Sequence, residues 1–395
     1  MSETRNLVVL GASYSGLSAA HYIARHILPK LQTSPEGQYA LHLVDPSTHF
    51  WWNVAAPREI VSVKEMTHEQ CFVPVMDGFK QYSNLKDSIV FHHGSATSID
   101  TEGRTLAIKT HEGGEETLPY HALVIATGIR SPTPLTKLAG HYTITTKALE
   151  EVNGRLASAK EIVISGGGPV GVETAGEIGS KYQGKAKITL VAGSDKLLPV
   201  LRRSLAEKAQ KQLEKVGVTV LYKTKVTGAE ETSDGKTEVK LDNGQSLTAD
   251  VYIPSFGVTP NTEFLPSNLK GQDNYVQTNP QTLRVDGAGP RVYAAGDVAN
   301  VDRGGILNLF NHLPVLGANL AHDLFPEAKV SPAVAEKKYA RKDGETQLVP
   351  VGAKTGVGAF NGWAMPGFAI SMIKGKDYML GQMSGITEGK KFAKA

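Results

Sequence analysis

A strand, a tight glycine turn, a helix and a second strand follow one another at the start of this chain, and the same order occurs again further along. The first unit has the apolar run NLVVLG at 6–11, an apolar helical face over 15–31 and the run YALHLV at 39–44. The second unit has EIVIS at 161–165 and, after the turn GGGPVG, KITLV at 187–191. This duplication predicts an α/β fold with two Rossmann-like (three-layer ββα) dinucleotide-binding domains.

Further apolar strands that stop at glycine lie between and after the two units. They are HALVIATG at 121–128, DVYIPSFG at 250–257 and RVYAAGD at 291–297. The last 70 or so residues carry glycine-rich apolar segments such as VGAKTGVGAF. We expect these to form a C-terminal α+β segment, which completes the predicted fold class.

The first glycine turn has the chemistry of a pyrophosphate-binding loop. Gly11 allows the sharp turn and Gly16 allows the helix to pack closely on the strand, while the unpaired N–H groups of the helix N-terminus face the phosphates. Ser13 replaces the usual middle glycine, and it is small and can donate a hydrogen bond. Asp45 ends the next strand, where it can accept hydrogen bonds from ribose hydroxyls. The expected contacts of this turn are Gly11, Ser13, Tyr14, Ser15, Gly16 and Asp45.

The second turn keeps all three glycines of the fingerprint. Its expected nucleotide contacts are Gly166, Gly168, Pro169, Val170, Gly171 and Glu173. For Glu177, on the same helix, we favour a capping charge that the helix dipole stabilises. The alternative for either turn is a glycine-rich unit that binds no ligand, but the duplication argues against it.

The strand at 187–191 ends in Val191-Ala192-Gly193-Ser194, so no carboxylate stands at the strand end, where an NAD-specific site usually has one. Lys196, Arg202 and Arg203 follow instead, so we expect NADPH to be accepted alongside NADH.

Charge and cysteine content exclude several functions. The chain has 42 Lys and Arg against 39 Asp and Glu, a net charge of +3 that gives no electrostatic basis for nucleic-acid binding. Cys71 is the only cysteine, so an intrachain redox disulfide and a thiolate metal site are impossible. The histidines have no ligand spacing, and we predict no metal site.

The first predicted strand, at 6–11, lies close to the start of the sequence. Its apolar run is too short for a signal peptide, Ser2 does not fit a myristoylation motif, and no apolar stretch approaches the ~18 residues of a membrane span. We therefore expect a cytoplasmic protein.

Two dinucleotide turns, with Ala126-Thr127-Gly128 between them and Gly296-Asp297 after them, resemble the two-dinucleotide-domain flavoproteins of the pyridine nucleotide-disulfide oxidoreductase superfamily. The stretch DPSTHFWWNVAAPREIV at 45–61 and the motifs GASYSG and GPVGVETAGE are similar to the apoptosis-inducing-factor-like and ferroptosis-suppressor-protein-like (AMID-like) subgroup, in particular its fungal members. The resemblance implies a discontinuous FAD-binding domain at 1–130 and 255–325. It also implies an NAD(P)H-binding domain at 131–254 and a C-terminal segment at 326–395.

The resemblance also implies roles for single residues. Asp297 after Gly296 would bind the ribitol chain of FAD, and Thr127-Gly128 would mark the first crossing between domains. A helix that begins at Pro314 would direct its N-terminus at the flavin, and proline suits a first helical position. Arg58 would contact FAD, Glu173 would contact the nicotinamide carboxamide, and Lys374 would approach the flavin or quinone as a catalytic residue.

The expected activity is that of an FAD-dependent NAD(P)H:quinone-type oxidoreductase. Hydride transfer to flavin needs stacking and exclusion of water rather than an acid or base. Without a second cysteine, electrons must pass from flavin directly to a quinone, to oxygen, to another small oxidant or to a protein carrier. Trp52 is a candidate catalytic residue, because the aromatic run Phe50-Trp51-Trp52, together with Trp363, Met365, Phe368 and Met372, could line an apolar quinone pocket. The alternative is that these side chains pack in the core; Trp52 is also a departure from ferroptosis suppressor protein, which has histidine there.

Two other functions stay open at this point. One is a pathway-specific redox enzyme that acts on a secondary metabolite, and the other is a signalling or cell-death flavoprotein with weak enzymatic activity. A lysine-rich C-terminal tail could also rest on an anionic membrane surface, although we favour a solvated tail. The lysines are Lys374, Lys376, Lys390, Lys391 and Lys394.

Overall fold

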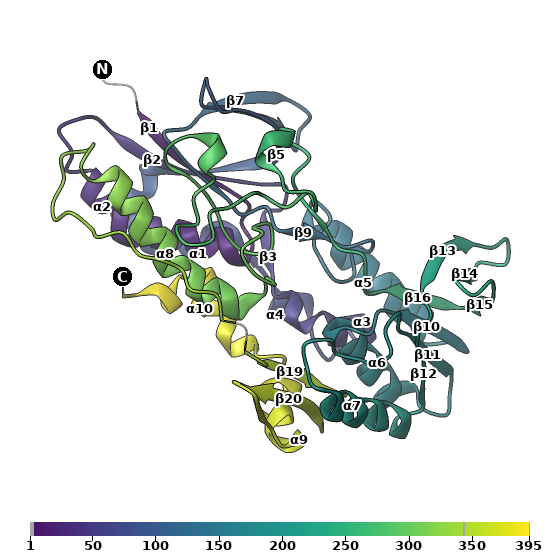
Figure 1. Ribbon diagram of the computed structural model, residues 1–395. Coiled ribbons are helices and arrows are strands. Elements are labelled where there is room, and N and C mark those ends of the chain that lie inside the picture. The colour runs from purple at the N-terminus through teal and green to yellow at the C-terminus, as the bar shows by residue number, and fades with distance from the viewer. Residues whose placement is uncertain (1–3, 343, 395) are drawn as a thin grey trace.

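A computed structural model describes residues 4–342 and 344–394 of the chain. Its larger sheet has the strand order β18-β8-β1-β2-β5-β6-β7 (Figure 1). The bounds are β1 Arg5–Leu10, β2 Tyr39–Asp45, β5 Ile89–Asp100, β6 Thr105–Thr110, β7 Glu115–Pro119, β8 Ala122–Ile125 and β18 Val292–Ala294.

Strands β18, β8, β1, β2 and β5 of this sheet run parallel, which brings the ends of β1 and β8 to one edge. Consecutive residues of β1, β2 and β8 are buried, so these strands are covered on both faces. Helix α1 (Tyr14–Tyr22) continues through a π-helical stretch, Ile23–Ile27, into α2 (Leu28–Leu31), and α8 (Ile306–Leu324) packs beside α1. The antiparallel pairs β5–β6 and β6–β7 extend the sheet on one side.

A second parallel sheet has the order β12-β11-β10-β16 and forms the lower right part of the molecule in Figure 1. Its strands are β10 Glu161–Ser165, β11 Lys187–Val191, β12 Val218–Leu221 and β16 Val251–Pro254. Helices α5 (Tyr142–Leu156), α6 (Pro169–Tyr182) and α7 (Arg203–Lys215) pack against it, and an antiparallel sheet is attached to it. That sheet contains β13 Val226–Glu231, β14 Thr237–Leu241 and β15 Ser246–Ala249.

The chain passes between the two parallel sheets through a pair of short strands. β9 (Ile129–Arg130) and β17 (Thr259–Pro260) run antiparallel side by side. Thr127 Oγ1 donates to the carbonyl of Asn261 at 2.7 Å, and Asn261 Nδ2 donates back to the carbonyl of Thr127 at 2.9 Å. The two segments that connect the parallel sheets are thus hydrogen-bonded to each other.

Shorter elements connect the parallel sheets to the C-terminal segment. They are β3 His49–Trp51, β4 Phe72–Pro74, α3 Ala56–Val61, α4 His68–Cys71, β19 Gln347–Pro350, β20 Gly356–Phe360, β21 Trp363–Ala364, α9 Gly367–Ile370 and α10 Met383–Thr387. The sheet β19-β20-β21 lies below α8, beside α7 (Figure 1). Together with the two parallel sheets it confirms the predicted fold class.

The end of the C-terminal segment is fixed to the larger sheet's helices rather than extending as a solvated tail. His21 Nε2 lies 2.9 Å from the carbonyl of Thr387, and His26 Nε2 lies 2.8 Å from that of Phe392. Lys391 Nζ stands 4.5 Å from the centre of the Phe310 ring. The backbone of this segment is therefore packed against those helices, whereas the side chains of Lys390, Lys391 and Lys394 are exposed to solvent.

Helix α8 begins at Ile306, so the prediction that it starts at Pro314 is wrong. Proline lacks the N–H that would bind the carbonyl four residues earlier, yet it lies inside the helix. The buried face of Leu309, Leu313 and Leu316 runs across it at helical spacing, and the Gly305 N–H before the helix is bound by Asp297 Oδ1 at 2.7 Å. Among the described helices, none is long and apolar enough to span a membrane.

Candidate active site

The first glycine turn is as crowded as its sequence predicts. A Cβ atom at Gly11, which has φ +99°, would lie 2.4 Å from the carbonyl oxygen of Ala126, and one at Gly16 would lie 1.7 Å from that of Gly11. No other residue fits either position. Ser13 is the N-cap of α1 and uses no side-chain hydrogen bond there, so its hydroxyl is available at the helix N-terminus.

Asp45 closes this turn from the neighbouring strand. Its Oδ2 accepts the N–H of Ala12 at 2.6 Å and its Oδ1 accepts the N–H of Ser47 at 2.7 Å. Burial raises the pKa of this carboxyl to about 6, against the lowering effect of the two backbone donors. Each carboxylate oxygen keeps a further lone pair, so Asp45 can still accept from ribose hydroxyls. The residues of the first turn fit an adenosine dinucleotide.

Gly296 and Asp297 reach the same edge from β18. A Cβ atom at Gly296, with φ +79°, would lie 1.8 Å from Ser15 Oγ, which joins this turn directly to the start of α1. Asp297 Oδ1 accepts from Gly305 and its Oδ2 lies 3.4 Å from Lys137 Nζ. Gly128 also has positive φ, +64°, and no atom stands within 4 Å of where its Cβ would be.

The second turn repeats the first in the smaller parallel sheet. Cβ atoms at Gly166 and Gly171 would lie 2.5 Å from the carbonyl oxygen of Ser255 and 1.9 Å from that of Gly166. Gly168 is the N-cap of α6, with open space in front of its Cα, and Pro169 is the first residue of the helix. Val170 follows and is 36% exposed. This open helix N-terminus fits the pyrophosphate of a second dinucleotide.

Glu173 and Lys374, both predicted from the resemblance, form an ion pair. Lys374 Nζ lies 2.5 Å from Glu173 Oε1 and 3.3 Å from the carbonyl oxygen of Leu348. Burial raises the pKa of the Glu173 carboxyl, while the ammonium of Lys374 acts to lower it. The pair joins the second nucleotide helix to the C-terminal segment, and Lys374 is therefore not one of the solvent-facing lysines.

Arg58 lies in a buried interdomain cluster that sequence reasoning missed. Its Nη2 is 2.7 Å from Glu177 Oε1, and its guanidinium also donates to the carbonyls of Gly375 at 2.8 Å and Lys376 at 2.7 Å. The Tyr378 hydroxyl donates to Glu177 Oε1 at 3.0 Å, and burial raises the pKa of that phenol well above its usual value.

These contacts correct the expectation for Glu177. It is not a capping charge, since it lies in the middle of α6 and is only 7% exposed. Arg58 donates to Glu177 and to the carbonyls of Gly375 and Lys376, and its contact with FAD stays a prediction. The sequence shows one basic residue, Arg58, and one acidic residue, Glu177, each within an apolar helical stretch. This pattern does not tell which residue each of them contacts.

Trp52 is a core residue. Its side chain is 1% exposed, its Nε1 donates to the carbonyl of Tyr378 at 2.8 Å, and its ring lies 5.6 Å from that of Tyr14. Phe50 and Trp51 are buried as well. The ring therefore packs against Tyr14 and the C-terminal segment instead of lining an open pocket, because β3 turns this aromatic run inward.

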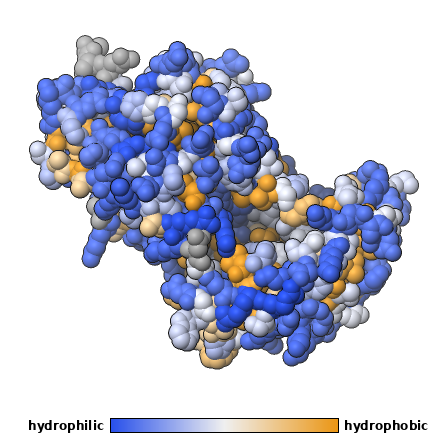
Figure 2. All heavy atoms as spheres, viewed as in Figure 1, coloured by the Kyte–Doolittle hydropathy of each residue, from blue (hydrophilic) through white to orange (hydrophobic). Residues whose placement is uncertain are grey.

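An apolar cavity of about 680 Å³ lies where α8 meets the β19-β20-β21 sheet. Its lining residues are Leu307, Thr346, Gln347, Leu348, Phe360, Trp363, Ala364, Met365, Pro366, Ile373 and Met379. Of the predicted aromatic group, Trp363 and Met365 line it, whereas Phe368 and Met372 are exposed outside it. Figure 2 shows the molecule hollowed between its upper and lower parts, with apolar side chains on the walls.

The three cations expected near the adenosine of NADPH are all engaged. Arg202 Nη1 lies 2.5 Å from Glu345 Oε2, and Arg203 Nη2 lies 2.5 Å from Asp195 Oδ2. Lys196 Nζ donates to the carbonyls of Pro199 and Leu201. In the Arg203–Asp195 pair both side chains are more than half exposed, whereas Glu345, the partner of Arg202, is 18% exposed. Arg203 is therefore the cation that can most easily leave its partner to bind a 2′-phosphate.

Cys71 is fully buried, and burial raises the pKa of its thiol far above its ordinary value. Such a thiol is a poor nucleophile. In the described part of the chain, no group of three or more His, Cys, Asp or Glu side chains is arranged to hold a metal ion.

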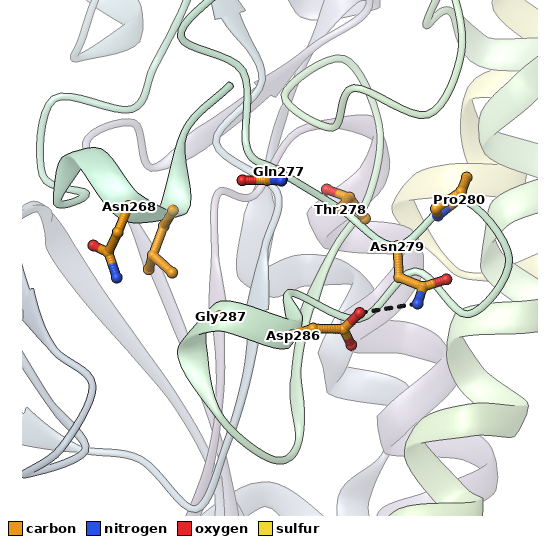
Figure 3. A pocket seen from close by; sticks show the side chains of 8 residues that line it. Asn268, Gln277, Thr278, Asn279, Pro280, Asp286 and Gly287 are labelled. Atoms are coloured by element: carbon orange, nitrogen blue, oxygen red, sulfur yellow. Dashed lines mark hydrogen bonds between the residues drawn. The ribbon is translucent and has the colours of Figure 1, made fainter. Parts of the chain in front are cut away.

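Figure 3 shows a smaller polar pocket, with a volume of about 350 Å³. Figure 3 shows Asn279 hydrogen-bonded to Asp286 on one side and Asn268 on the other. None of the predicted site residues lines it. Its walls are Asn268, Leu269, Gln277, Thr278, Asn279, Pro280, Asp286 and Gly287.

The chain matches known proteins over its whole length. Oxidoreductase phnG of Penicillium herquei is 40% identical over 413 residues, which cover 100% of this chain and 98% of that protein. Ferroptosis suppressor protein 1 of Mus musculus is 26% identical over 394 residues, covering 95% of this chain and 94% of that one. These similarities confirm the resemblance inferred from the sequence.

A solved structure and a family model also match this chain. NDH2 from Plasmodium falciparum in complex with NADH superposes with a TM-score of 0.71 at 13% identity, covering 99% of this chain and 97% of that one, so the fold is shared. Residues 5–318 match the family model of pyridine nucleotide-disulphide oxidoreductases. The match spans both glycine turns and the strands that carry them, and FAD and a nicotinamide dinucleotide are the cofactors. The chain belongs to the pyridine nucleotide-disulphide oxidoreductase family.

Proposed function

We propose that this oxidoreductase takes electrons from NADPH or NADH and passes them, through bound FAD and without a redox disulfide, to a quinone-like aromatic acceptor. The nicotinamide supplies a hydride and the flavin accepts it, then releases the electrons to the oxidant. The protein's own task is to hold both dinucleotides and the acceptor in register and to keep water away.

We assign FAD to the turn at 11–16 and the nicotinamide dinucleotide to the turn at 166–171. The FAD-binding domain would then comprise 1–130 and 255–325, the NAD(P)H-binding domain 131–254 and the C-terminal segment 326–395. Asp45 supports the first assignment, because it is already aligned by two backbone donors and can accept from a ribose. The open N-terminus of α6 at Gly168 supports the second.

The acceptor site is the apolar cavity, and one observation carries this assignment. The cavity is lined by Leu348, and the carbonyl of Leu348 accepts a hydrogen bond from Lys374, which is paired with Glu173 on the nucleotide helix. Cavity, lysine and nucleotide helix thus form one contiguous unit. Lys374 directly follows the lining residue Ile373, and we assign to its ammonium the proton that a reduced quinone oxygen would take up.

Size and polarity also suit an aromatic acceptor. A volume of about 680 Å³ lies within the usual range for small-molecule sites, roughly 300–1,000 Å³. The walls carry Trp363, Phe360 and Met365, which stack on or pack against flat rings.

Steady-state kinetics of the purified FAD-loaded protein test the proposal. We expect oxidation of NADPH or NADH with menadione or a ubiquinone analogue to be faster than with oxygen alone. Trp363→Ala should raise the KM for the quinone at least several-fold while leaving ferricyanide reduction and FAD content unchanged. Ile144→Ala, which removes an exposed apolar side chain on α5, is the matched control. A protein that binds no FAD, or a Trp363→Ala enzyme with unchanged quinone KM, would contradict the proposal.

A bulkier aromatic secondary metabolite is the second candidate acceptor. The cavity exceeds the volume of a single benzoquinone ring, which favours a fused-ring substrate. A panel of quinones of increasing ring number distinguishes the two, since a fused-ring substrate predicts a KM that falls as rings are added.

A further inference from the structure

Three arginines gather at the amino edge of the larger sheet, opposite the edge that carries the glycine turns. Arg5 is the first residue of β1, Arg291 immediately precedes β18, and Arg104 immediately precedes β6. We call Arg5, Arg104 and Arg291 the arginine cluster. Six residue steps of extended chain separate Arg5 from Gly11 by roughly 20 Å, so a ligand of the cluster would not overlap the dinucleotide turn at 11–16.

Two members of the cluster converge on a single acceptor. Arg104 Nη2 donates to the carbonyl oxygen of His121 at 2.8 Å, and Arg291 Nε donates to the same oxygen at 3.0 Å. Both arginines have positive φ, 53° and 60°, a backbone conformation that L-residues rarely adopt. The fold thus holds two like charges together in a strained arrangement, and functional sites are where such strain collects.

Carboxylates do not balance these charges. Glu327 forms ion pairs with two of the arginines, with Arg291 at 2.7 Å and with Arg5 at 3.8 Å. The nearby Glu36 is paired with Lys329 at 2.7 Å. Burial and the charge of Arg291 lower the pKa of His121 to about 4, so its ring is neutral at pH 7. Four positive groups, the three arginines and Lys329, therefore have two carboxylates, Glu327 and Glu36, as partners.

Several donors of the cluster have no protein acceptor. Within the described residues, Arg104 Nε is buried without a partner, and neither Arg104 Nη1 nor Arg291 Nη2 donates a hydrogen bond to the protein. Arg104 otherwise rests on the Tyr120 ring, 4.7 Å from its centre. Guanidinium groups with paired free donors match the oxygen geometry of phosphate.

We propose that the arginine cluster binds a small phosphate-class oxyanion with two or more negative charges, at a site separate from both dinucleotides. The anion would supply the charge that Glu327 alone does not, and it would accept from the free donors of Arg104 and Arg291. By binding where β1, β6 and β18 begin, it would link elements that only the folded FAD-binding half brings together.

Isothermal titration calorimetry with inorganic pyrophosphate tests the site. The protein is loaded with FAD and saturated with NADP⁺, so that both glycine turns are occupied, and potassium chloride of matched ionic strength is the blank. We expect one pyrophosphate per chain. Arg104→Gln and Arg291→Gln should each raise the Kd at least tenfold, whereas Arg104→Lys, which keeps the charge, should raise it less.

Lys86→Gln is the matched control, since it removes an exposed cation from the same half of the molecule and should leave the Kd unchanged. FAD content and the unfolding temperature of each variant show that it is folded. Equal binding by the wild type and Arg104→Gln would overturn the proposal, as would no heat beyond that of chloride, or binding of citrate without binding of pyrophosphate.

Discussion

Arg58 on α3 and Glu177 on α6 form a buried ion pair between the two dinucleotide-binding halves, with Nη2 and Oε1 2.7 Å apart and both side chains 8% exposed. The carbonyls of Gly375 and Lys376 and the hydroxyl of Tyr378 complete their hydrogen bonding. Three distant parts of the chain therefore meet at one charge pair. Because the pair joins α3, α6 and the C-terminal segment, it helps to determine how the halves are aligned.

Removal of one partner should be costly. Glu177→Leu leaves the Arg58 guanidinium buried without its counter-charge, and we expect the free energy of unfolding to fall by about 3–5 kcal/mol. Urea unfolding measures this. The double variant Arg58→Met/Glu177→Leu should lose less than the sum of the single variants, by about 2 kcal/mol or more, since no isolated charge remains.

The exposed pair Lys187–Glu161 is the control for this cycle, with its side chains 67% and 40% exposed. Lys187→Ala should cost at most about 1 kcal/mol because water already solvates both charges. Additive effects at Arg58 and Glu177, within about 0.5 kcal/mol, would show that the two side chains do not act as a pair.

Cys71 should be dispensable for turnover. Because burial raises the pKa of its thiol, we expect no reaction with Ellman's reagent in the native protein at pH 8 and one thiol per chain after denaturation. Cys71→Ala should keep NAD(P)H oxidation within about twofold of the wild type. Rapid modification of the native protein would show that the thiol is accessible, and loss of activity in a folded Cys71→Ala protein would contradict the prediction.

Acidification should weaken the attachment of the C-terminal segment through His21. Burial lowers the pKa of His21 from 6.5 to about 4, so between these values the unfolded chain binds a proton that the folded chain does not. Stability is therefore lost as the pH falls from about 6.5 to about 4, by about 3 kcal/mol for this one group. His21→Gln should lose that much less stability over the same interval. His322→Gln, at an exposed position on α8, should follow the wild-type pH dependence.

Arg203 should discriminate between the two nicotinamide dinucleotides. It is the half-exposed partner of Asp195 after the strand that would contact the adenosine ribose. We expect Arg203→Gln to raise the KM for NADPH about fivefold and to leave the KM for NADH unchanged. Lys208→Gln, elsewhere on α7, is the control. Equal changes with both nucleotides would remove Arg203 from the 2′-phosphate site.

The sequence predicted the glycine turns because their cause is local. A Cβ atom at Gly16 or Gly171 would collide with the carbonyl oxygen of the first glycine of its own turn, so the constraint acts within six residues. Strands bounded by such turns could be predicted to within about two residues for the same reason. Asp45 also followed from its place at the end of β2.

The interdomain contacts could not be predicted in this way. Arg58 and Glu177 are far apart in the chain, and their carbonyl partners come from a third segment. Trp52 faces inward because β3 pairs with β4, which its own sequence does not specify. The prediction that α8 begins at Pro314 was wrong because burial of the helix's apolar face stabilises it more than one missing backbone hydrogen bond destabilises it.

The ion pair at Arg58 also has a consequence for how the protein is made. When Glu177 leaves the ribosome, both charged partners exist, but the carbonyls of Gly375 and Lys376 that complete the guanidinium's coordination are still almost 200 residues from synthesis. The two nucleotide-binding halves can each collapse on their own glycine turns during translation. Their final alignment must wait for the last part of the chain, so an interrupted translation product would hold its cofactor sites without the geometry that joins them.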